Sequence, residues 1–222
     1  MSVRLFIQAI VKYAFGVLTV GALLFIPATL DYWNGWLFMG LLFIPMFIAG
    51  VALMIKNPDL LKKRLDIKEK QGKQKQIILF SAVMFVVGFI VAGLNYRYKW
   101  IELPNIVIII SSVVFVLAYI LYAAVLRENE YLSRTIEVQD NQKVIDTGLY
   151  GIVRHPMYAA TILLFLTMPL ILGSIISFMI FVFYPIIIVT RIKNEEEILE
   201  RDLKGYLEYE KKVRYRIVPF VW

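Results

Sequence analysis

Residues 157–190 read MYAATILLFLTMPLILGSIISFMIFVFYPIIIVT, an almost unbroken apolar run. A bilayer core about 30 Å thick is spanned by roughly 20 apolar residues, so this run is too long for one membrane helix. It is long enough for two short helices, and the pair Gly173 and Ser174 offers a place to turn between them. The stretch therefore predicts a tight helical hairpin within a membrane.

The composition of the whole chain is that of a membrane protein. Hydrophobic residues make up 60% and charged residues 18% of its 222 positions, whereas soluble globular domains contain roughly 45–50% and 25% of these classes. The mean hydropathy is +0.71. A net charge of +7 would suggest nucleic-acid binding in a soluble protein, but here basic residues beside anionic lipid explain it better. We therefore expect membrane lipids as partners and no nucleic acid.

The residue types also limit the chemistry. The sequence contains no cysteine and a single histidine, His155. Disulfides, iron–sulfur clusters, cysteine nucleophiles and metal sites with several histidine ligands are therefore excluded. We expect no bound metal.

Four further apolar stretches precede the hairpin. They cover residues 6–30, 33–55, 77–96 and 104–126. With the hairpin they predict an all-α integral membrane protein of about six transmembrane helices, or five if residues 157–190 form one bent element. We treat residues 1–222 as a single membrane domain, in which residues 1–126 hold four N-terminal spans and residues 127–222 carry the candidate catalytic residues.

Three polar segments lie outside these spans. Residues 56–76 form a charged connection with room for a short surface helix, and residues 127–155 form a longer polar segment. Residues 191–222 are charged, but apolar side chains recur there at helical spacing, at Ile198, Leu199, Leu203, Tyr206 and Leu207. This spacing predicts an amphipathic C-terminal helix on or near the membrane surface.

The basic residues indicate the orientation. With six spans and the N-terminus in the cytoplasm, 22 of the 24 lysines and arginines lie on the cytoplasmic side, and only Arg97 and Lys99 lie outside. Cytoplasmic loops of membrane proteins carry such an excess. We therefore expect both termini, the C-terminal helix and the candidate active site to be cytoplasmic.

Two polar clusters flank the hairpin, at residues 127–158 and 191–210. A hairpin returns its ends to the same membrane face, so the clusters are predicted to be neighbours. Such a site can take a polar molecule from water and a lipophilic one from the bilayer. Each cluster alone also fits ordinary roles, with Arg154 as an interfacial anchor and with Arg191 and Glu195 as a surface ion pair on one helix face.

Together the clusters follow a distinctive order. It runs Gly148-x-Tyr150-x-x-x-Arg154-His155-Pro156-x-Tyr158, the apolar hairpin, Arg191-x-x-x-Glu195-Glu196-x-x-Leu199, Gly205-Tyr206-x-x-Tyr209 and a late Pro219. This order resembles the isoprenylcysteine carboxyl methyltransferase family and its relatives, the phospholipid methyltransferases. The resemblance extends over residues 129–219, whereas the first four spans match only in being hydrophobic.

The resemblance implies a membrane enzyme that uses S-adenosylmethionine to methylate a lipophilic small molecule or a lipidated substrate. The family's cofactor-binding positions fall here on Gln142, Lys143, Val144, Ile145, Tyr150, His155, Pro156, Met157, Tyr158 and Glu195. The family arginine that faces the methyl acceptor corresponds to Arg191. The family often has histidine where Gln142 stands, so any role that needs an imidazole there is lost.

The implied chemistry depends on the acceptor. A carboxylate, as in isoprenylcysteine, is already a nucleophile at neutral pH, so positioning and water exclusion would carry most of the rate. Arg191 would neutralise that carboxylate or a lipid phosphate, and Glu195 would pair with the cofactor's ammonium or ribose hydroxyls. An amine acceptor would instead need a general base, for which His155 is the nearby candidate. His155 and Arg191 are therefore the candidate catalytic residues.

Other functions remain open on the sequence alone. Methyl transfer to a phospholipid or another lipid amine is the nearest alternative to a carboxylate acceptor. Some membrane sterol reductases have a comparable C-terminal half, which would hold NADPH. A non-enzymatic transporter or membrane scaffold is the third alternative, although the spans carry almost no charged residue that would mark a transport path.

Overall fold

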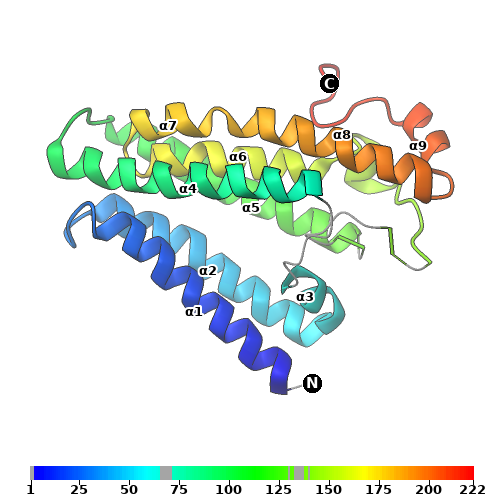
Figure 1. Ribbon diagram of the computed structural model, residues 1–222, viewed down its shortest axis with the longest axis horizontal. Coiled ribbons are helices and arrows are strands. Elements are labelled where there is room, and N and C mark those ends of the chain that lie inside the picture. Colours follow the sequence, from blue (N-terminus) through cyan, green and yellow to red (C-terminus); the bar gives the residue numbers. More distant parts are fainter. Residues whose placement is uncertain (1–2, 66–71, 130, 133–137, 140) are drawn as a thin grey trace.

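The computed structural model describes residues 3–65, 72–129, 131–132, 138–139 and 141–222, and within them it consists of helices and loops. The elements are α1 (Val3–Phe25), α2 (Trp33–Lys56), α3 (Pro58–Leu65), α4 (Gly72–Tyr98), α5 (Asn105–Glu128), η1 (Gly148–Gly151), α6 (Pro156–Ile171), α7 (Ile175–Phe181), α8 (Tyr184–Asp202) and α9 (Tyr206–Lys212) (Figure 1). The predicted all-α fold is confirmed, and α3 occupies the place left for a surface helix.

In the described part of the chain, five helical stretches are long and apolar enough to cross a membrane. They are Leu5–Phe25, Trp33–Lys56, Lys75–Tyr98, Asn105–Glu128 and Ile175–Asp202, the last of which joins α7 and α8. Helix α6 is equally apolar but has 16 residues, and it packs along α5, α7 and α8. The predicted hairpin is therefore two helices lying side by side, and the alternative of one bent element is wrong. Gly173, at φ +72°, makes the turn between them.

Three turns meet at one end of the bundle, those between α1 and α2, between α4 and α5, and between α6 and α7. The Tyr32 hydroxyl donates to the Leu172 carbonyl, and Asn34 Nδ2 donates to the Ile171 carbonyl at 3.0 Å. Asn95 Nδ2, beside the turn between α4 and α5, donates to the Ile101 carbonyl at 2.9 Å and to the Gly173 carbonyl at 3.4 Å. Buried amides and hydroxyls need such partners, so these bonds fix the three turns together. Both chain ends consequently lie toward the opposite end, which we call the site end (Figure 1).

Helices α4 and α7 approach each other unusually closely. A Cβ atom at Gly88 would lie 2.3 Å from the Phe181 ring, and Ser177 Oγ donates to the Gly88 carbonyl at 2.8 Å. Phe85 packs edge-on against Phe181 and against Phe165 of α6. These contacts hold the hairpin against α4, and so they fix where its two ends emerge at the site end.

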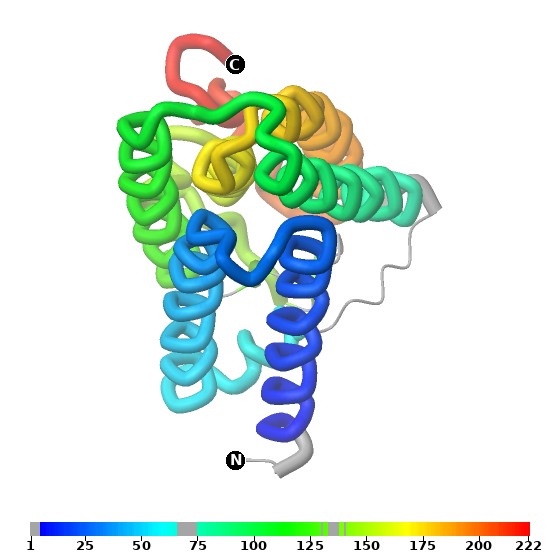
Figure 2. Tube along the Cα trace, turned by 90° about the vertical axis from the view of Figure 1, so that its left-hand side faces the viewer, coloured from blue at the N-terminus to red at the C-terminus, as the bar shows by residue number. Residues whose placement is uncertain are grey.

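Helices α1 and α2 form a hairpin that lies beside the layer containing α4 to α8, with α1 packed against α4 and α2 against α5 (Figures 1 and 2). Large apolar side chains on α1 face outward, and Phe15 and Leu18 are 70% and 72% exposed. Such faces suit lipid contact, since lipid tails are as apolar as the side chains. The length, apolarity and outward faces of the helices are those of an integral membrane protein.

The C-terminal region differs from the single amphipathic helix predicted from sequence. Helix α8 ends at Asp202, and Gly205 adopts a left-handed conformation at φ +90° before α9 begins. Leu203 and Tyr206 are buried in a small cluster with Val144 and Val213. The apolar side chains thus pack against the polar segment that precedes α6, because the break at Gly205 turns α9 back toward it.

Candidate functional site

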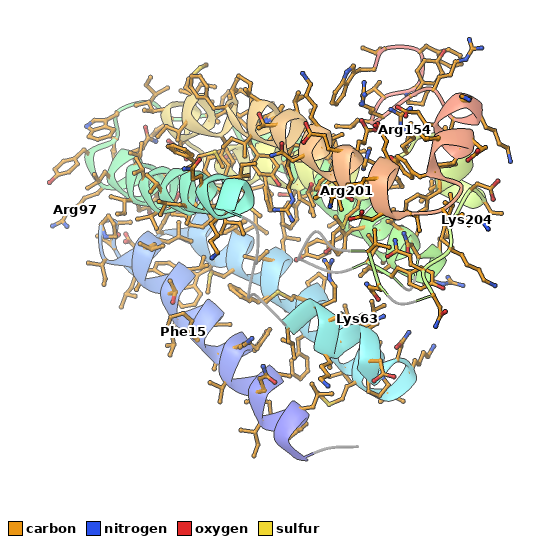
Figure 3. The ribbon with its side chains drawn as sticks, turned by 45° about the vertical axis from the view of Figure 1, so that its right-hand side comes forward. Phe15, Lys63, Arg97, Arg154, Arg201 and Lys204 are labelled. Atoms are coloured by element: carbon orange, nitrogen blue, oxygen red, sulfur yellow. The ribbon has the colours of Figure 1, made fainter. Side chains whose placement is uncertain are left out.

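A pocket lies at the site end, between the segment before α6, the first turn of α6, the last turns of α8, and α9. Its walls include every sequence-predicted site residue except Pro156, namely Gln142, Lys143, Val144, Ile145, Tyr150, His155, Met157, Tyr158, Arg191 and Glu195. Pro156 is buried at the first position of α6. Figure 3 turns this end forward, with Arg154, Arg201 and Lys204 labelled around it. The two polar clusters predicted to be neighbours do meet.

Tyr158 connects the two sides of the hairpin inside this pocket. Arg191 Nε donates to the Tyr158 hydroxyl at 2.9 Å, and that hydroxyl donates to Glu195 Oε2. Arg191 and Glu195 therefore share one face of α8, as their spacing predicted. They do so as parts of a partly buried polar chain that includes a buried tyrosine of α6, and hydrogen bonds to charged groups are among the stronger ones.

Glu196 is the centre of an ionic network that sequence reasoning missed. Its side chain is 3% exposed. Oε1 accepts from Arg154 Nε at 2.9 Å and lies 3.1 Å from His155 Nε2, while Oε2 accepts from Arg216 Nε at 2.7 Å. The sequence offers three successive glutamates, and only packing decides which one turns inward. The motif glutamate that meets His155 is therefore Glu196, one position beyond the predicted cofactor ligand.

Arg154 is buried, which corrects its interpretation as an interfacial anchor. Its Nη1 donates to the carbonyls of Val213 and Arg214 at 3.0 and 3.2 Å, and its Nη2 lies 2.9 Å from Glu210 Oε1. A guanidinium has five donors in a rigid fork, so one side chain can join α8, α9 and the C-terminal segment. Arg154 thus organises the floor of the pocket.

The backbone before α6 pairs with the C-terminal segment. The Arg154 and His155 amides donate to the carbonyls of Tyr215 and Arg216 at 2.9 and 2.8 Å. The His155 carbonyl in turn accepts from the Tyr158 amide at 3.0 Å. His155 is the N-cap residue of α6, but its side chain does not cap the helix and instead reaches Glu196. The buried carboxylate is a stronger partner for the imidazole than the backbone amides of the first helical turn.

The segment before α6 forms the opposite wall. The Leu149 amide donates to Glu128 Oε2 at 2.8 Å, and the Tyr150 carbonyl accepts from the Tyr209 hydroxyl at 2.7 Å. The Gln142 side-chain carbonyl accepts from the Gln139 amide at 2.9 Å, which leaves its amide group as the part that can donate to a ligand.

Burial and local charge set the protonation of several side chains around the pocket. Burial raises the pKa of Tyr150, of Tyr206 and of Tyr209 well above the ordinary tyrosine value. At the exposed rim, the hydrogen bond from Lys212 lowers the pKa of Asp146 below its usual range. The tyrosines therefore remain neutral hydroxyls that can donate hydrogen bonds.

Helix α3, from the half of the chain that carries no motif, contacts two residues of the pocket wall. Lys63 lies 5.9 Å above the ring of Tyr131, and Arg64 Nη1 lies 3.8 Å from the sulfur of Met157. Tyr131 and Met157 both line the pocket. No local sequence pattern predicts these contacts, because they depend on how the hairpin of α1 and α2 packs.

The fold and the pocket define the class, which is an all-helical integral membrane protein with a polar pocket at one end of its bundle. Residues 107–201 match the isoprenylcysteine carboxyl methyltransferase (ICMT) family, so the resemblance inferred from the motifs is confirmed. This region runs from α5 to α8 and contains the motif arginine, histidine and glutamates.

A curated relative has a different stated activity. The Delta(14)-sterol reductase TM7SF2 of Mus musculus is 28% identical over 91 residues. The match covers 40% of this chain and 22% of that protein. The matched stretch therefore spans about a fifth of the length of this relative.

Proposed function

We propose that this protein transfers the methyl group of S-adenosylmethionine to a lipophilic acceptor at the membrane interface, and that the acceptor group is a carboxylate of the isoprenylcysteine kind. One observation carries the proposal. The lining of the pocket includes, from both sides of the hairpin, residues that the resemblance assigns to the cofactor, together with Arg191 of α8. The positive-inside pattern supports a cytoplasmic location for this pocket and for both termini.

The residues present suit this cofactor. Glu195 offers a carboxylate to an ammonium group or to ribose hydroxyls, and Tyr150 and Met157 offer an aromatic and a thioether wall. When bound, S-adenosylmethionine supplies an electrophilic methyl group on a sulfonium. The residues of the protein have to hold this methyl group beside Tyr158 and Arg191, in a pocket that excludes water.

The acceptor side favours a carboxylate over an amine. Arg191 lies one helical turn nearer the apolar first half of α8 than Glu195, so its guanidinium can hold an anionic group that arrives from the bilayer. A carboxylate in that position needs no proton removed. An amine would require a base, and the Nε2 atom of His155 already engages Glu196. Orientation of two reactants is sufficient for large rate gains, with effective molarities equivalent to about 7–11 kcal/mol.

A reductase is the second candidate, because TM7SF2 shares part of this sequence. NADPH would then occupy the same pocket and a sterol would approach from the bilayer. A transporter or scaffold has less support, since the buried charged side chains of the described residues, Arg154 and Glu196, lie at one end of the bundle instead of along its middle.

Label transfer tests the proposal. The full chain in detergent micelles is incubated with methyl-labelled S-adenosylmethionine and either an S-prenylated cysteine or phosphatidylethanolamine. We expect a base-labile methyl ester on the prenylcysteine. Label on the amine would change the acceptor class, whereas reduction of a sterol by labelled NADPH without methyl transfer would reject the proposal.

Cofactor binding is compared between Glu195→Ala and the matched control Glu197→Ala. Glu195 lines the pocket, whereas Glu197 is exposed on the same helix. Glu195→Ala is expected to weaken cofactor binding by about tenfold or more, because removal of a charged hydrogen-bond partner costs about 1.5–3 kcal/mol. Glu197→Ala is expected to bind normally.

A further inference from the structure

Tyr206 has a hydroxyl without a hydrogen-bond partner. Its side chain is 4% exposed and lines the pocket. Within the described residues, Tyr206 Oη is the buried side-chain oxygen or nitrogen that lacks such a partner. A buried hydroxyl left unpaired costs free energy, so such a group calls for an explanation.

Packing prevents this hydroxyl from turning away. The ring lies in the cluster of Leu203, Tyr209 and Val213, with Val144 against it, and its centroid is 5.7 Å from that of Tyr209. The left-handed Gly205 fixes the start of α9 just before it. The neighbour Tyr209, on the same short helix, has its hydroxyl bonded to the Tyr150 carbonyl. The contrast between the two tyrosines makes a general packing defect of α9 a poor explanation.

The electrostatic surroundings suit a neutral donor. Burial is the main cause of the raised pKa of Tyr206, and the nearby carboxylates of Glu196 and Glu195 raise it further while Arg154 opposes them. The hydroxyl therefore keeps its proton and can donate it to a ligand atom.

The position along the helices indicates which ligand it meets. Arg191, Glu195 and Tyr206 follow one another from the membrane end of α8 toward α9. Tyr206 thus lies beyond Glu195, on the side away from the bilayer and in the same wall as Val144. A lipophilic acceptor enters from the opposite side, so the polar ligand from water is the one within reach.

We propose that the Tyr206 hydroxyl donates a hydrogen bond to the bound S-adenosyl cofactor. This inference rests on the proposed function, and it assigns a role to the Gly-Tyr-x-x-Tyr sequence at residues 205–209 that the proposed function leaves unused. The bond is made only when the ligand is present. Ligand binding therefore removes a penalty that the empty pocket carries.

Calorimetry on the full chain in detergent tests this with the substitution Tyr206→Phe, which removes one oxygen atom and little else. The probes are S-adenosylhomocysteine and 5′-methylthioadenosine, which lacks the amino-acid part. We expect Tyr206→Phe to weaken S-adenosylhomocysteine binding about tenfold. A similar loss for both probes places the bond on the nucleoside, and a loss for S-adenosylhomocysteine alone places it on the amino-acid part.

The ligand-free protein provides a second readout. Tyr206→Phe is expected to keep or raise the thermal midpoint, since no bond is lost, whereas Tyr209→Phe is expected to lower it because the bond to Tyr150 is lost. Tyr98→Phe, at the exposed far end, is the control for substitution and purification.

Several outcomes would overturn the inference. Equal affinity of the wild type and Tyr206→Phe for S-adenosylhomocysteine would show that the hydroxyl meets only water. A lowered midpoint without ligand would show a structural partner. If the wild type binds neither probe, the proposed function fails first and this inference fails with it.

Discussion

Arg154 and Glu196 lie 42 positions apart, yet Arg154 Nε and Nη2 contact Glu196 Oε1 at 2.9 and 2.8 Å. Both side chains are 3% exposed. The pair joins the residue that precedes the His-Pro sequence to the last turns of α8, so it holds together the two halves of the candidate site. Any ligand in the pocket depends on this junction, although Glu196 is not among the pocket-lining residues.

Glu196→Ala is expected to destabilise the protein by about 3–5 kcal/mol, because it removes the buried carboxylate that Arg154, His155 and Arg216 share and leaves the buried Arg154 with Glu210 alone as its acidic partner. Glu197→Ala, at an exposed position of the same helix, is expected to change stability by less than about 0.5 kcal/mol. Thermal unfolding in the same detergent compares the two variants. Equal midpoints of the two variants would contradict a stabilising role of the Glu196 network. If Glu196→Ala cannot be obtained folded while Glu197→Ala is obtained normally, the result agrees with that role.

The sequence was sufficient for features that depend on neighbours along the chain. The hairpin followed from the length of the apolar run, and its turn from Gly173. The shared face of Arg191 and Glu195 followed from helical spacing. The break of the C-terminal helix had a local signal in Gly205, because glycine is a poor helix former and a frequent end point, but the apolar spacing on both sides of it outweighed that signal.

The features of the site that could not be predicted from the sequence depend on tertiary packing. Nothing in the run Glu195, Glu196 and Glu197 shows which carboxylate is buried, since that depends on the rotation of α8 against α6 and the C-terminal segment. The burial of Arg154 follows from the same packing. The approach of Lys63 to Tyr131 likewise depends on how two hairpins far apart in sequence meet.

Arg191 and Glu195 are expected to behave differently when each is replaced by alanine. Glu195→Ala should weaken cofactor binding, whereas Arg191→Ala should leave it nearly unchanged and reduce methyl transfer. Arg191→Lys should restore transfer only in part, because a point charge replaces a planar fork. Titration of cofactor binding and assay of transfer on all three variants decide this. If Arg191→Ala kept full turnover, its assignment to the acceptor would be abandoned.

The arrangement of the turns leads to a prediction on topology. Lys99 lies by the turn between α4 and α5, and α3 and Trp222 lie toward the site end (Figure 1). Reporters at Lys62 and Trp222 are therefore expected on the cytoplasmic side, with a reporter at Lys99 on the other side. Accessibility labelling in intact cells measures all three. Opposite locations for Lys62 and Trp222 would require an odd number of crossings between them.

Alkaline pH is expected to destabilise the ligand-free protein, in part through Tyr206. Its pKa is raised by burial in the folded state, whereas in the unfolded chain tyrosine ionises near pH 10. The unfolded state then binds fewer protons than the folded state above that pH, so the stabilising contribution is complete below about pH 10 and declines as the pH rises. Between about pH 10 and 11, ionisation of one such tyrosine in the unfolded chain lowers the free energy of unfolding by about 1 kcal/mol. Tyr206→Phe should therefore lose less stability than the wild type over this interval in thermal unfolding, and parallel losses would show that the Tyr206 hydroxyl reaches water.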